Sequence, residues 1–316
     1  MRFSVAIPAF KKTYLRECIN SVLDQTYQDY EIIIVNDASP ENLNSILSEF
    51  QDLRIKYYVN PKGFGGYNVV GNWNKCLEYA SGDYIICMGD DDRLMPNTLS
   101  YFSEAIDKYP KMEVFHIRTQ IIDENSNVIS EQKRAPEIES VYSLMWNIWN
   151  GRITYIGDYL FKSDKLRQIG GFYNLPYAWY SDRITPFLCA KQYGIININK
   201  IGFQFRVSRK HISAIGVHSD EKLKAWIHVE HWYSDFLCTK PQEVDDVKYW
   251  MMLKTYVNEF IWDKKVWIIA EDLFRSPARC THWVMCKSDL AISWKMLFKA
   301  IYLYIRLLIN NKDIVQ

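Results

Sequence analysis

The chain has 316 residues, enough for one sizeable core and a smaller additional unit. Its formal net charge is +1 at pH 7, so no strong positive field points to nucleic acid as a partner. Seven cysteines occur without a C-x-x-C pair, which favours buried, reduced thiols over disulfides or a zinc site and predicts a cytoplasmic protein. No run of about 18 uncharged apolar residues occurs, so no transmembrane helix is predicted.

The first hundred residues alternate strand and helix signals. Strands are predicted at 3–7, 31–35, 55–59 and 83–88, and helices at 13–24, 40–50 and 72–80. This alternation predicts an α/β fold with a parallel, doubly wound sheet. Ligands of such sheets bind beyond the carboxyl ends of the strands. Asp37 follows the second predicted strand and the segment 90–92 follows the fourth, so carboxylates stand where a ligand is expected.

The pattern is less regular in the middle of the chain. Strands are predicted at 113–119 and 195–207, and helices at 141–149 and 184–193. A further helix is predicted after residues 155–162, ending at Gly170-Gly171. From about Asp220 onward the pattern is mostly helical, interrupted at Pro277. We therefore predict a core over residues 1–216 and a helical C-terminal extension over residues 217–316.

The strongest local signal is Gly89-Asp90-Asp91-Asp92. Adjacent carboxylates repel one another near neutral pH, and a divalent cation removes this cost. Mg²⁺ and Mn²⁺ prefer oxygen ligands, and the position after a buried strand favours a metal site. The alternative is a solvated acidic turn that caps the next helix.

Six segments occur together in one order and spacing. They are residues 5–10, 21–27, 31–39, 71–74, 80–85 and 90–92. Together they resemble glycosyltransferase family 2, the inverting enzymes of GT-A fold. The resemblance fades after Gly171 and does not extend past about Gly216. It implies a Rossmann-like, mostly parallel sheet flanked by helices, with a nucleotide-sugar half at about 1–110 and an acceptor half at about 111–216.

The resemblance also implies roles for residues near the first two strands. Pro8, Ala9 and Phe10 match the loop that contacts the nucleotide. Asp37 matches the acid that hydrogen-bonds the base, usually uracil, which makes a UDP-sugar the favoured donor. The alternative for Asp37 is an N-cap of the following helix.

Lys62 and Asn68 lie in a glycine-containing segment that approaches the nucleotide in the family. Glycines there permit close approach of the backbone, although a plain flexible loop also explains them. Asn72 and Asn74 are interpreted as binding groups or as helix caps, with neither favoured.

The triplet matches the family's D-x-D pair, which holds ribose and a metal ion on the diphosphate. The resemblance implies Mn²⁺ or Mg²⁺ held by Asp90 and Asp92, with Asp90 and Asp91 at the nucleotide. The family often has Asp where Gly89 stands, so which of the three acids touches the metal stays open.

A late histidine completes the metal site in related GT-A enzymes, and His211 is the candidate here. Arg206 lies in the same basic stretch, which suits a diphosphate. The alternative is an exposed basic turn.

An inverting transfer needs a base for the acceptor hydroxyl. Asp182 matches the acid of the family's Glu-Asp pattern, but Ser181 stands in place of the Glu. The alternatives for Asp182 are an ion pair with Arg183 and an N-cap of the next helix.

The C-terminal helix has aromatic and basic residues at helical spacing. It either packs on the core or lies on the inner membrane surface as a peripheral contact.

The sequence thus predicts an inverting glycosyltransferase that acts on a glycan or lipid-linked glycan in cell-surface polysaccharide synthesis. Two alternatives are a sugar-phosphate nucleotidyltransferase and a non-catalytic member that binds a nucleotide or lipid carrier. The absence of a Gly-rich loop at residues 8–12 argues against the nucleotidyltransferase.

Overall fold

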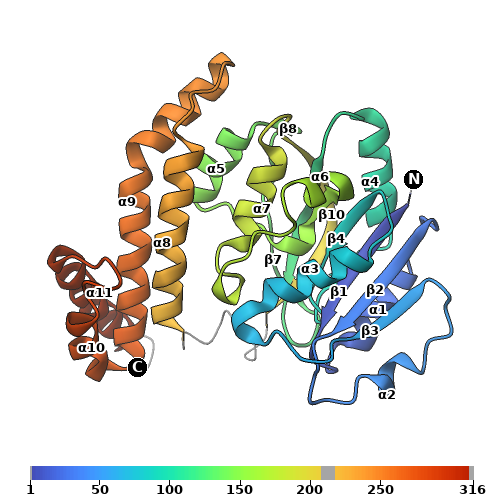
Figure 1. Cartoon of the computed structure of the whole chain (residues 1–316), viewed down its shortest axis with the longest axis horizontal. Coiled ribbons are helices and arrows are strands. Elements are labelled where there is room, and N and C mark those ends of the chain that lie inside the picture. The colour runs from blue at the N-terminus through green and yellow to red at the C-terminus, as the bar shows by residue number, and fades with distance from the viewer. Residues whose placement is uncertain (1, 208–217, 313–316) are drawn as a thin grey trace. The chain divides into compact units, whose positions relative to one another are not determined.

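The computed structural model describes residues 2–207 and 218–312, with side chains described through residue 309. The chain forms two compact units, Met1–Ser208 and Arg209–Gln316 (Figure 1). The boundary that the sequence predicted at 216 falls among residues 208–217, outside the described part of the chain.

The described part of the first unit contains one ten-stranded sheet, with strand order β3-β2-β1-β4-β9-β6-β10-β5 and with β7 on β6 and β8 on β10. The strands are β1 (Phe3–Ala9), β2 (Tyr30–Asn36), β3 (Ile55–Val59), β4 (Tyr84–Cys87), β5 (Arg93–Leu94), β6 (Val114–Ile122), β7 (Val128–Glu131), β8 (Ile138–Glu139), β9 (Tyr159–Lys162) and β10 (Ile195–Arg206).

Parallel pairing joins β3, β2, β1 and β4, as the alternation of strands and helices predicted. A second parallel pair, β6 with β10, lies beyond β9. Strand β9 pairs antiparallel with both β4 and β6, so it joins the two parallel parts into one sheet. The predicted mostly parallel α/β sheet is confirmed, and the antiparallel β9 at its centre was not predicted.

Helices flank this sheet (Figure 1). They are α1 (Leu15–Leu23), α2 (Asn44–Leu47), α3 (Val69–Tyr79), α4 (Thr98–Lys108), α5 (Val141–Trp149), α6 (Ser163–Gln168) and α7 (Ser181–Ala190). Alternate residues of β1, including Phe3, Val5 and Ile7, are fully buried in one cluster with side chains of α1 and α4. The apolar face of the strand, which repeats every two residues, thus packs against the apolar faces of helices, which repeat every 3.6 residues. Helix α3 packs against β1 and β2.

The predicted helix at 40–50 is shorter than expected, because only Asn44–Leu47 is helical. Pro40 cannot donate a backbone hydrogen bond, and Ser39 Oγ accepts one from the Glu41 backbone N–H at 3.0 Å. A turn therefore replaces the first part of the predicted helix.

The second unit is helical in its described part, as predicted. It contains α8 (Ser219–Phe236), α9 (Val244–Arg275), α10 (Cys280–Met285) and α11 (Trp294–Lys312). Helix α9 packs against both α8 and α11. Pro277 begins a short 3₁₀ turn between α9 and α10, which is the interruption that the sequence indicated. Among the described helices, none is both long enough and apolar enough to span a bilayer.

Glu31 is a buried charge that joins three segments of the first unit. Its fully buried carboxylate accepts hydrogen bonds from Ser4 Oγ at 2.7 Å, from the Ser81 backbone N–H at 2.7 Å and from Lys56 Nζ at 2.6 Å. Burial raises the pKa of this carboxyl, but the hydrogen bonds from Lys56, Ser4 and Ser81 outweigh it and bring the pKa to about 2.

We predict that Glu31→Gln lowers the free energy of unfolding by about 2–3 kcal/mol at neutral pH. Because the folded-state pKa lies below the unfolded value, this stability is present above about pH 4.5 and is lost as the pH falls toward about 2. Urea unfolding across that range measures both effects. Glu49→Gln is the control, since the exposed pair of Glu49 with Arg16 adds little. An equal effect of the two substitutions would contradict the prediction.

Candidate functional site

Asp90 connects the turn after β4 to the loop after β1. Its side chain is 8% exposed, and Oδ2 accepts hydrogen bonds from the backbone N–H groups of Phe10 at 2.6 Å and Lys11 at 2.7 Å. The Asp37 backbone N–H donates to the Ala9 carbonyl at 2.9 Å. The loop that contains Ala9 and Phe10 therefore touches the segments of both predicted acids, at the carboxyl ends of three neighbouring parallel strands.

Asp92 fixes the end of β10 against the acidic turn. Its Oδ1 accepts from the Arg206 backbone N–H at 3.0 Å, and its Oδ2 accepts from the Gly89 backbone N–H at 3.2 Å. Arg206 Nε donates to the Asp91 carbonyl at 2.8 Å. Both oxygens of Asp92 are thus used by backbone donors.

Gly89 stands where the resemblance to glycosyltransferase family 2 led us to expect another acid. A Cβ at this position would lie 2.9 Å from both Asp91 Oδ1 and Asp92 Oδ2. These contacts are too short for carbon and oxygen, so a larger residue requires the carboxylates to move. Glycine at 89 allows the acidic groups of Asp91 and Asp92 to approach the backbone here.

The three acids share one poorly solvated turn. Burial, with a smaller effect of Asp91, raises the pKa of Asp90 to about 6. Burial and then Asp91 raise the pKa of Asp92 well above its usual range. The three carboxylates offer only oxygen ligands, and their ionised forms are unfavourable in this turn. They therefore fit a hard divalent cation, whose charge offsets their mutual repulsion.

The Asp37 carboxylate holds the loop after β3. Oδ1 accepts from Asn60 Nδ2 at 3.1 Å and from the Phe64 backbone N–H at 2.8 Å, and Oδ2 accepts from the Gly65 backbone N–H at 3.0 Å. The N-cap of α2 is Leu43, so the helix-cap alternative for Asp37 is wrong. Asp37 instead shapes the glycine-containing segment that was predicted to approach a nucleotide.

Asn68 caps α3. Its side-chain oxygen accepts from the Gly71 backbone N–H at 3.1 Å and from Asn174 Nδ2 at 2.9 Å. Lys62, in the same segment, is exposed. The nucleotide roles predicted for Lys62 and Asn68 stay predictions.

Asn72 and Asn74 are not helix caps. Asn72 is buried and donates from Nδ2 to the Val35 carbonyl at 3.1 Å, while its oxygen accepts from Asn60 Nδ2 at 3.0 Å. Asn74 exchanges two hydrogen bonds with the Phe172 backbone, at 2.7 and 3.1 Å. Both residues fasten α3 to its neighbours.

Asp182 lies in the first turn of α7, and its side chain is 28% exposed. The N-cap of α7 is Tyr180, so the cap alternative for Asp182 is wrong, whereas an ion-pair contact with Arg183 Nη2 is present at 3.8 Å. Burial raises the pKa of Asp182, although Arg183 opposes this. Ser181 is fully buried, and its Oγ accepts from the Leu175 backbone N–H at 3.1 Å, so the position where the resemblance implied a Glu makes an internal contact.

Tyr155 was not singled out from the sequence. It stacks on Phe205 with ring centroids 3.9 Å apart. Its pKa is raised to about 12 by burial first, then by Asp158, and further by Asp92 and Asp182. Arg183 opposes this rise, and the sequence did not indicate Tyr155 because its ring partner Phe205 is distant along the chain.

Arg206 is fully buried and is therefore not part of an exposed basic turn. Its guanidinium pairs with Glu17 at 2.9 Å, donates to the Asp123 carbonyl at 3.1 Å and lies 4.1 Å from the Tyr14 ring centroid. These contacts commit it to the fold rather than to a diphosphate. His211, the candidate metal ligand, lies outside the described residues.

Comparison with known proteins decides the family. The model of Glycosyl transferase family 2 matches residues 4–171. The chain belongs to glycosyltransferase family 2. The match covers the Asp37 segment, the acidic turn and the sheet as far as β9.

Two curated relatives of this family 2 chain are bacterial enzymes. GalNAc(5)-diNAcBac-PP-undecaprenol β-1,3-glucosyltransferase of Campylobacter jejuni is 37% identical over 102 residues, which span 31% of this chain and 32% of that enzyme. The Escherichia coli enzyme WfgD, a UDP-Glc:α-D-GlcNAc-diphosphoundecaprenol β-1,3-glucosyltransferase, is 27% identical over 214 residues, 67% of this chain and 79% of that enzyme.

Solved structures share the fold. Residues 1–349 of S. aureus TarS, in complex with UDP-GlcNAc, align with a TM-score of 0.69 at 17% identity, over 97% of this chain and 89% of that chain. The mannosyltransferase PcManGT of Pyrobaculum calidifontis, in complex with GDP-Man and Mn²⁺, aligns with a TM-score of 0.54 at 13% identity, over 96% and 87% of the two chains. The predicted GT-A fold with C-terminal helices is confirmed.

We predict that Asp90→Asn stabilises the metal-free protein by about 1–3 kcal/mol at about pH 7.5. The folded-state pKa of Asp90, about 6, exceeds its unfolded value. Ionised Asp90 therefore lowers the stability of the folded protein fully above about pH 6, and this cost disappears as the pH falls below about 4. The amide keeps one oxygen for the N–H groups of Phe10 and Lys11. Urea unfolding in a chelator measures the effect.

Asp164→Asn is the matched control, because the side chain of Asp164 is 91% exposed. It is expected to leave stability unchanged across the same pH range. A less stable Asp90→Asn protein at about pH 7.5 would show that the N–H contacts outweigh the repulsion.

Proposed function

We propose that this protein is a metal-dependent, inverting glycosyltransferase that moves a sugar from a nucleoside-diphosphate donor to a hydroxyl of a glycan or lipid-linked glycan, in cell-surface polysaccharide synthesis. One observation carries the proposal. The loop after β1 is hydrogen-bonded both to the segment that begins at Asp37 and to the Asp90 carboxylate, at the strand ends where a GT-A fold binds its donor.

Asp37 is proposed to read the base of the donor. A carboxylate has about four acceptor positions, and three are used by Asn60, Phe64 and Gly65. The remaining position suits a ring N–H such as that of uracil. Phe10 is 45% exposed beside Pro8 and Ala9, so its ring offers a surface for the nucleotide. A UDP-sugar is the favoured donor, and the names of TarS in its complex and of WfgD point the same way.

Asp90 and Asp91 are proposed as the acids nearest the diphosphate and its cation. Asp92 uses both oxygens on backbone N–H groups, whereas the contacts of Asp90 with Phe10 and Lys11 use only Oδ2. A bound Mn²⁺ or Mg²⁺ supplies Lewis-acid stabilisation of the leaving nucleoside diphosphate. Asp92 positions the turn through its backbone contacts, and each of its oxygens keeps a further acceptor position, so Asp92 and His211 stay proposed metal ligands.

Asp182 is proposed as the base that takes the proton of the acceptor hydroxyl. Its raised pKa makes it a stronger proton acceptor than an ordinary carboxylate, and its partial exposure leaves room for an acceptor. Arg183 is held by the Thr154 carbonyl at 2.5 Å, so the neighbouring cation is fixed by the fold.

A place on the cytoplasmic face of the membrane is proposed from α11. Its exposed large side chains include Trp294, Phe298, Tyr302 and Ile305, at 52%, 68%, 52% and 47% exposure. Lys295 and Lys299 lie between them along the chain and Arg306 follows Ile305, and such a helix suits an anionic lipid surface, where a lipid-linked acceptor is found.

Calorimetric titration with UDP, GDP and TDP tests the donor site. We expect UDP to bind most tightly, with an affinity that falls at least about tenfold without Mn²⁺ or in Asp91→Asn. Asp164→Asn is the control. If the folded protein binds none of these nucleotides with Mn²⁺ present, the proposal fails; preference for GDP or TDP would move the donor but keep the class.

Asp182→Asn tests the catalytic role. Removal of a general base lowers kcat by about a hundredfold or more, while UDP affinity stays within about twofold. Steady-state kinetics of transfer from the preferred donor measures kcat, and calorimetric titration measures the affinity for UDP. An unchanged kcat would remove Asp182 as the base, and a natural chain that turns over no donor would favour the non-catalytic alternative.

Flotation with phosphatidylglycerol vesicles tests membrane contact. The natural chain is expected to float with the vesicles. The double variant Phe298→Glu, Ile305→Glu is expected not to float, because it no longer buries these apolar side chains in the membrane interface. Val244→Glu is the control, since Val244 on α9 is 84% exposed. Equal flotation of all three proteins contradicts the contact.

A further inference from the structure

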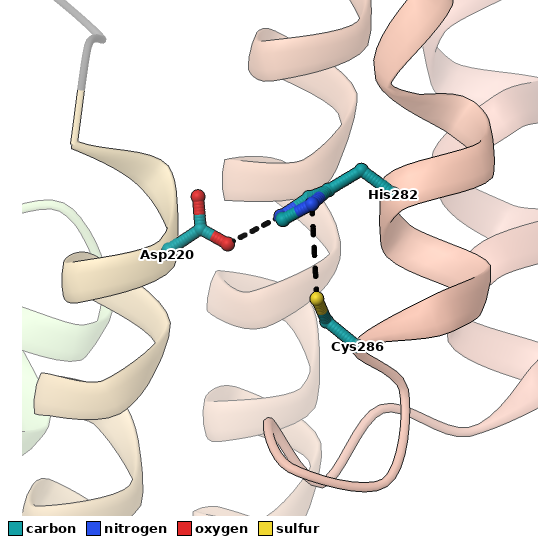
Figure 2. A group of neighbouring side chains, drawn as sticks. All are labelled: Asp220, His282 and Cys286. Carbon is teal, nitrogen blue, oxygen red and sulfur yellow. Dashed lines mark hydrogen bonds and ion pairs between the residues drawn. The ribbon is translucent and has the colours of Figure 1, made fainter.

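A second cluster of ligand-type side chains lies within the helical unit. Asp220 lies on α8, His282 on α10, and Cys286 directly after α10 (Figure 2). One ligand atom of each residue lies within 4.8 Å of the others, and all three residues are half-buried.

The imidazole of His282 lies between its two neighbours, as Figure 2 shows. Its Nε2 lies 2.5 Å from Asp220 Oδ1, and its Nδ1 lies 3.7 Å from Cys286 Sγ. Nitrogen and sulfur ligands of one tetrahedral zinc ion are about 3.5 Å apart, given their bond lengths. His282 and Cys286 are therefore spaced as two ligands of one ion.

Outer contacts hold the carboxylate in place. Arg279 pairs with Asp220 Oδ2 and donates from Nε to Asp272 at 2.6 Å. Trp283 Nε1 donates to the same Asp272 oxygen at 2.9 Å. The Oδ1 atom of Asp220 is left to face His282, and such outer partners are what orient metal ligands in proteins.

The charges of the cluster also suit a divalent ion. Asp220 and Asp272 are negative and Arg279 is positive, which leaves one net negative charge. Ionisation of the Cys286 thiol on metal binding adds a second, so a doubly charged cation makes the group neutral.

We propose that Asp220, His282 and Cys286 bind one Zn²⁺ that joins α8 to α10. One ion takes only one imidazole nitrogen, so Nδ1 binds beside Sγ. Asp220 Oδ1 then exchanges its contact with Nε2 for the ion, which requires the ring and the carboxylate to turn while Oδ2 stays paired with Arg279. Sulfur and nitrogen ligands select zinc-like ions, whereas the all-oxygen acidic turn of the first unit selects Mg²⁺ or Mn²⁺. The chain then carries two separate sites of different metal preference.

A bound zinc ion would stabilise the fold of the helical unit. The ion cross-links residues of α8 and α10 that are far apart in the sequence, and binding to the folded state alone stabilises that state. The ligands escaped the sequence analysis because no C-x-x-C pair is present. The signal that was available is a His and a Cys four residues apart, about one helical turn.

Zinc titration of the full-length chain in excess Mg²⁺ tests the site. We expect one tightly bound Zn²⁺ per chain, a Co²⁺ derivative with a thiolate-to-cobalt absorption band, and release of about one proton per ion at neutral pH. Cys286→Ser should abolish the band and the proton release. Asp220→Asn should weaken zinc affinity by about tenfold or more.

Cys280→Ser is the matched control, because Cys280 is a half-buried thiol on the same helix that does not belong to the cluster. It should bind zinc like the natural chain. No bound zinc in the natural chain, or an equal loss in Cys280→Ser, overturns the proposal. Binding of UDP with Mn²⁺ is measured in parallel and should be unchanged in Cys286→Ser, so failure of this site is distinguished from failure of the proposed donor site.

Discussion

The contact of the Asp90 carboxylate with the backbone N–H groups of Phe10 and Lys11 is the constraint on which the candidate site depends. It fixes the loop after β1 over the end of β4, across 80 residues of sequence. The same loop meets the Asp37 segment through the Ala9 carbonyl. Parallel pairing brings the carboxyl ends of β1, β2 and β4 to the same edge of the sheet. The contacts of the loop after β1 then fix the positions of Asp37 and Asp90 at this edge.

The acids of the first unit serve the fold before they serve a ligand. Asp37, Asp90 and Asp92 each accept two or more hydrogen bonds from the chain, mostly from backbone N–H groups. Charge-assisted bonds of this kind are short and directional, so they position the loops without a large apolar contact. The cost is electrostatic, since burial and mutual repulsion raise the pKa values of Asp90 and Asp92. A site built in this way favours a cation.

The sequence predicted those elements that have a strong local pattern. Strands β1 to β4 are apolar runs bounded by turn residues, and the acidic turn follows β4 directly, so both were predictable from residue order. The strands β5 and β8 have two residues each, too few for a period to be recognised. The burial of Arg206 was also missed, because its partners Glu17 and Asp123 are distant in sequence and only the folded sheet brings them together. The Asp220 cluster depends on helix packing for the same reason.

Arg206 has a consequence for how the family 2 chain changes over evolutionary time. Its backbone and side chain touch the acidic turn, while its guanidinium pairs with Glu17 on α1. Loss of Glu17 removes the carboxylate partner of a fully buried guanidinium, which is unfavourable, whereas Glu17 itself is 36% exposed and also pairs with Arg93 at 3.0 Å. Substitution of Glu17 is therefore expected to be limited as long as Arg206 stays buried. Helix α1 has no predicted catalytic role, yet substitution at Glu17 on this helix is limited because Glu17 pairs with the arginine that contacts the turn of Asp91 and Asp92.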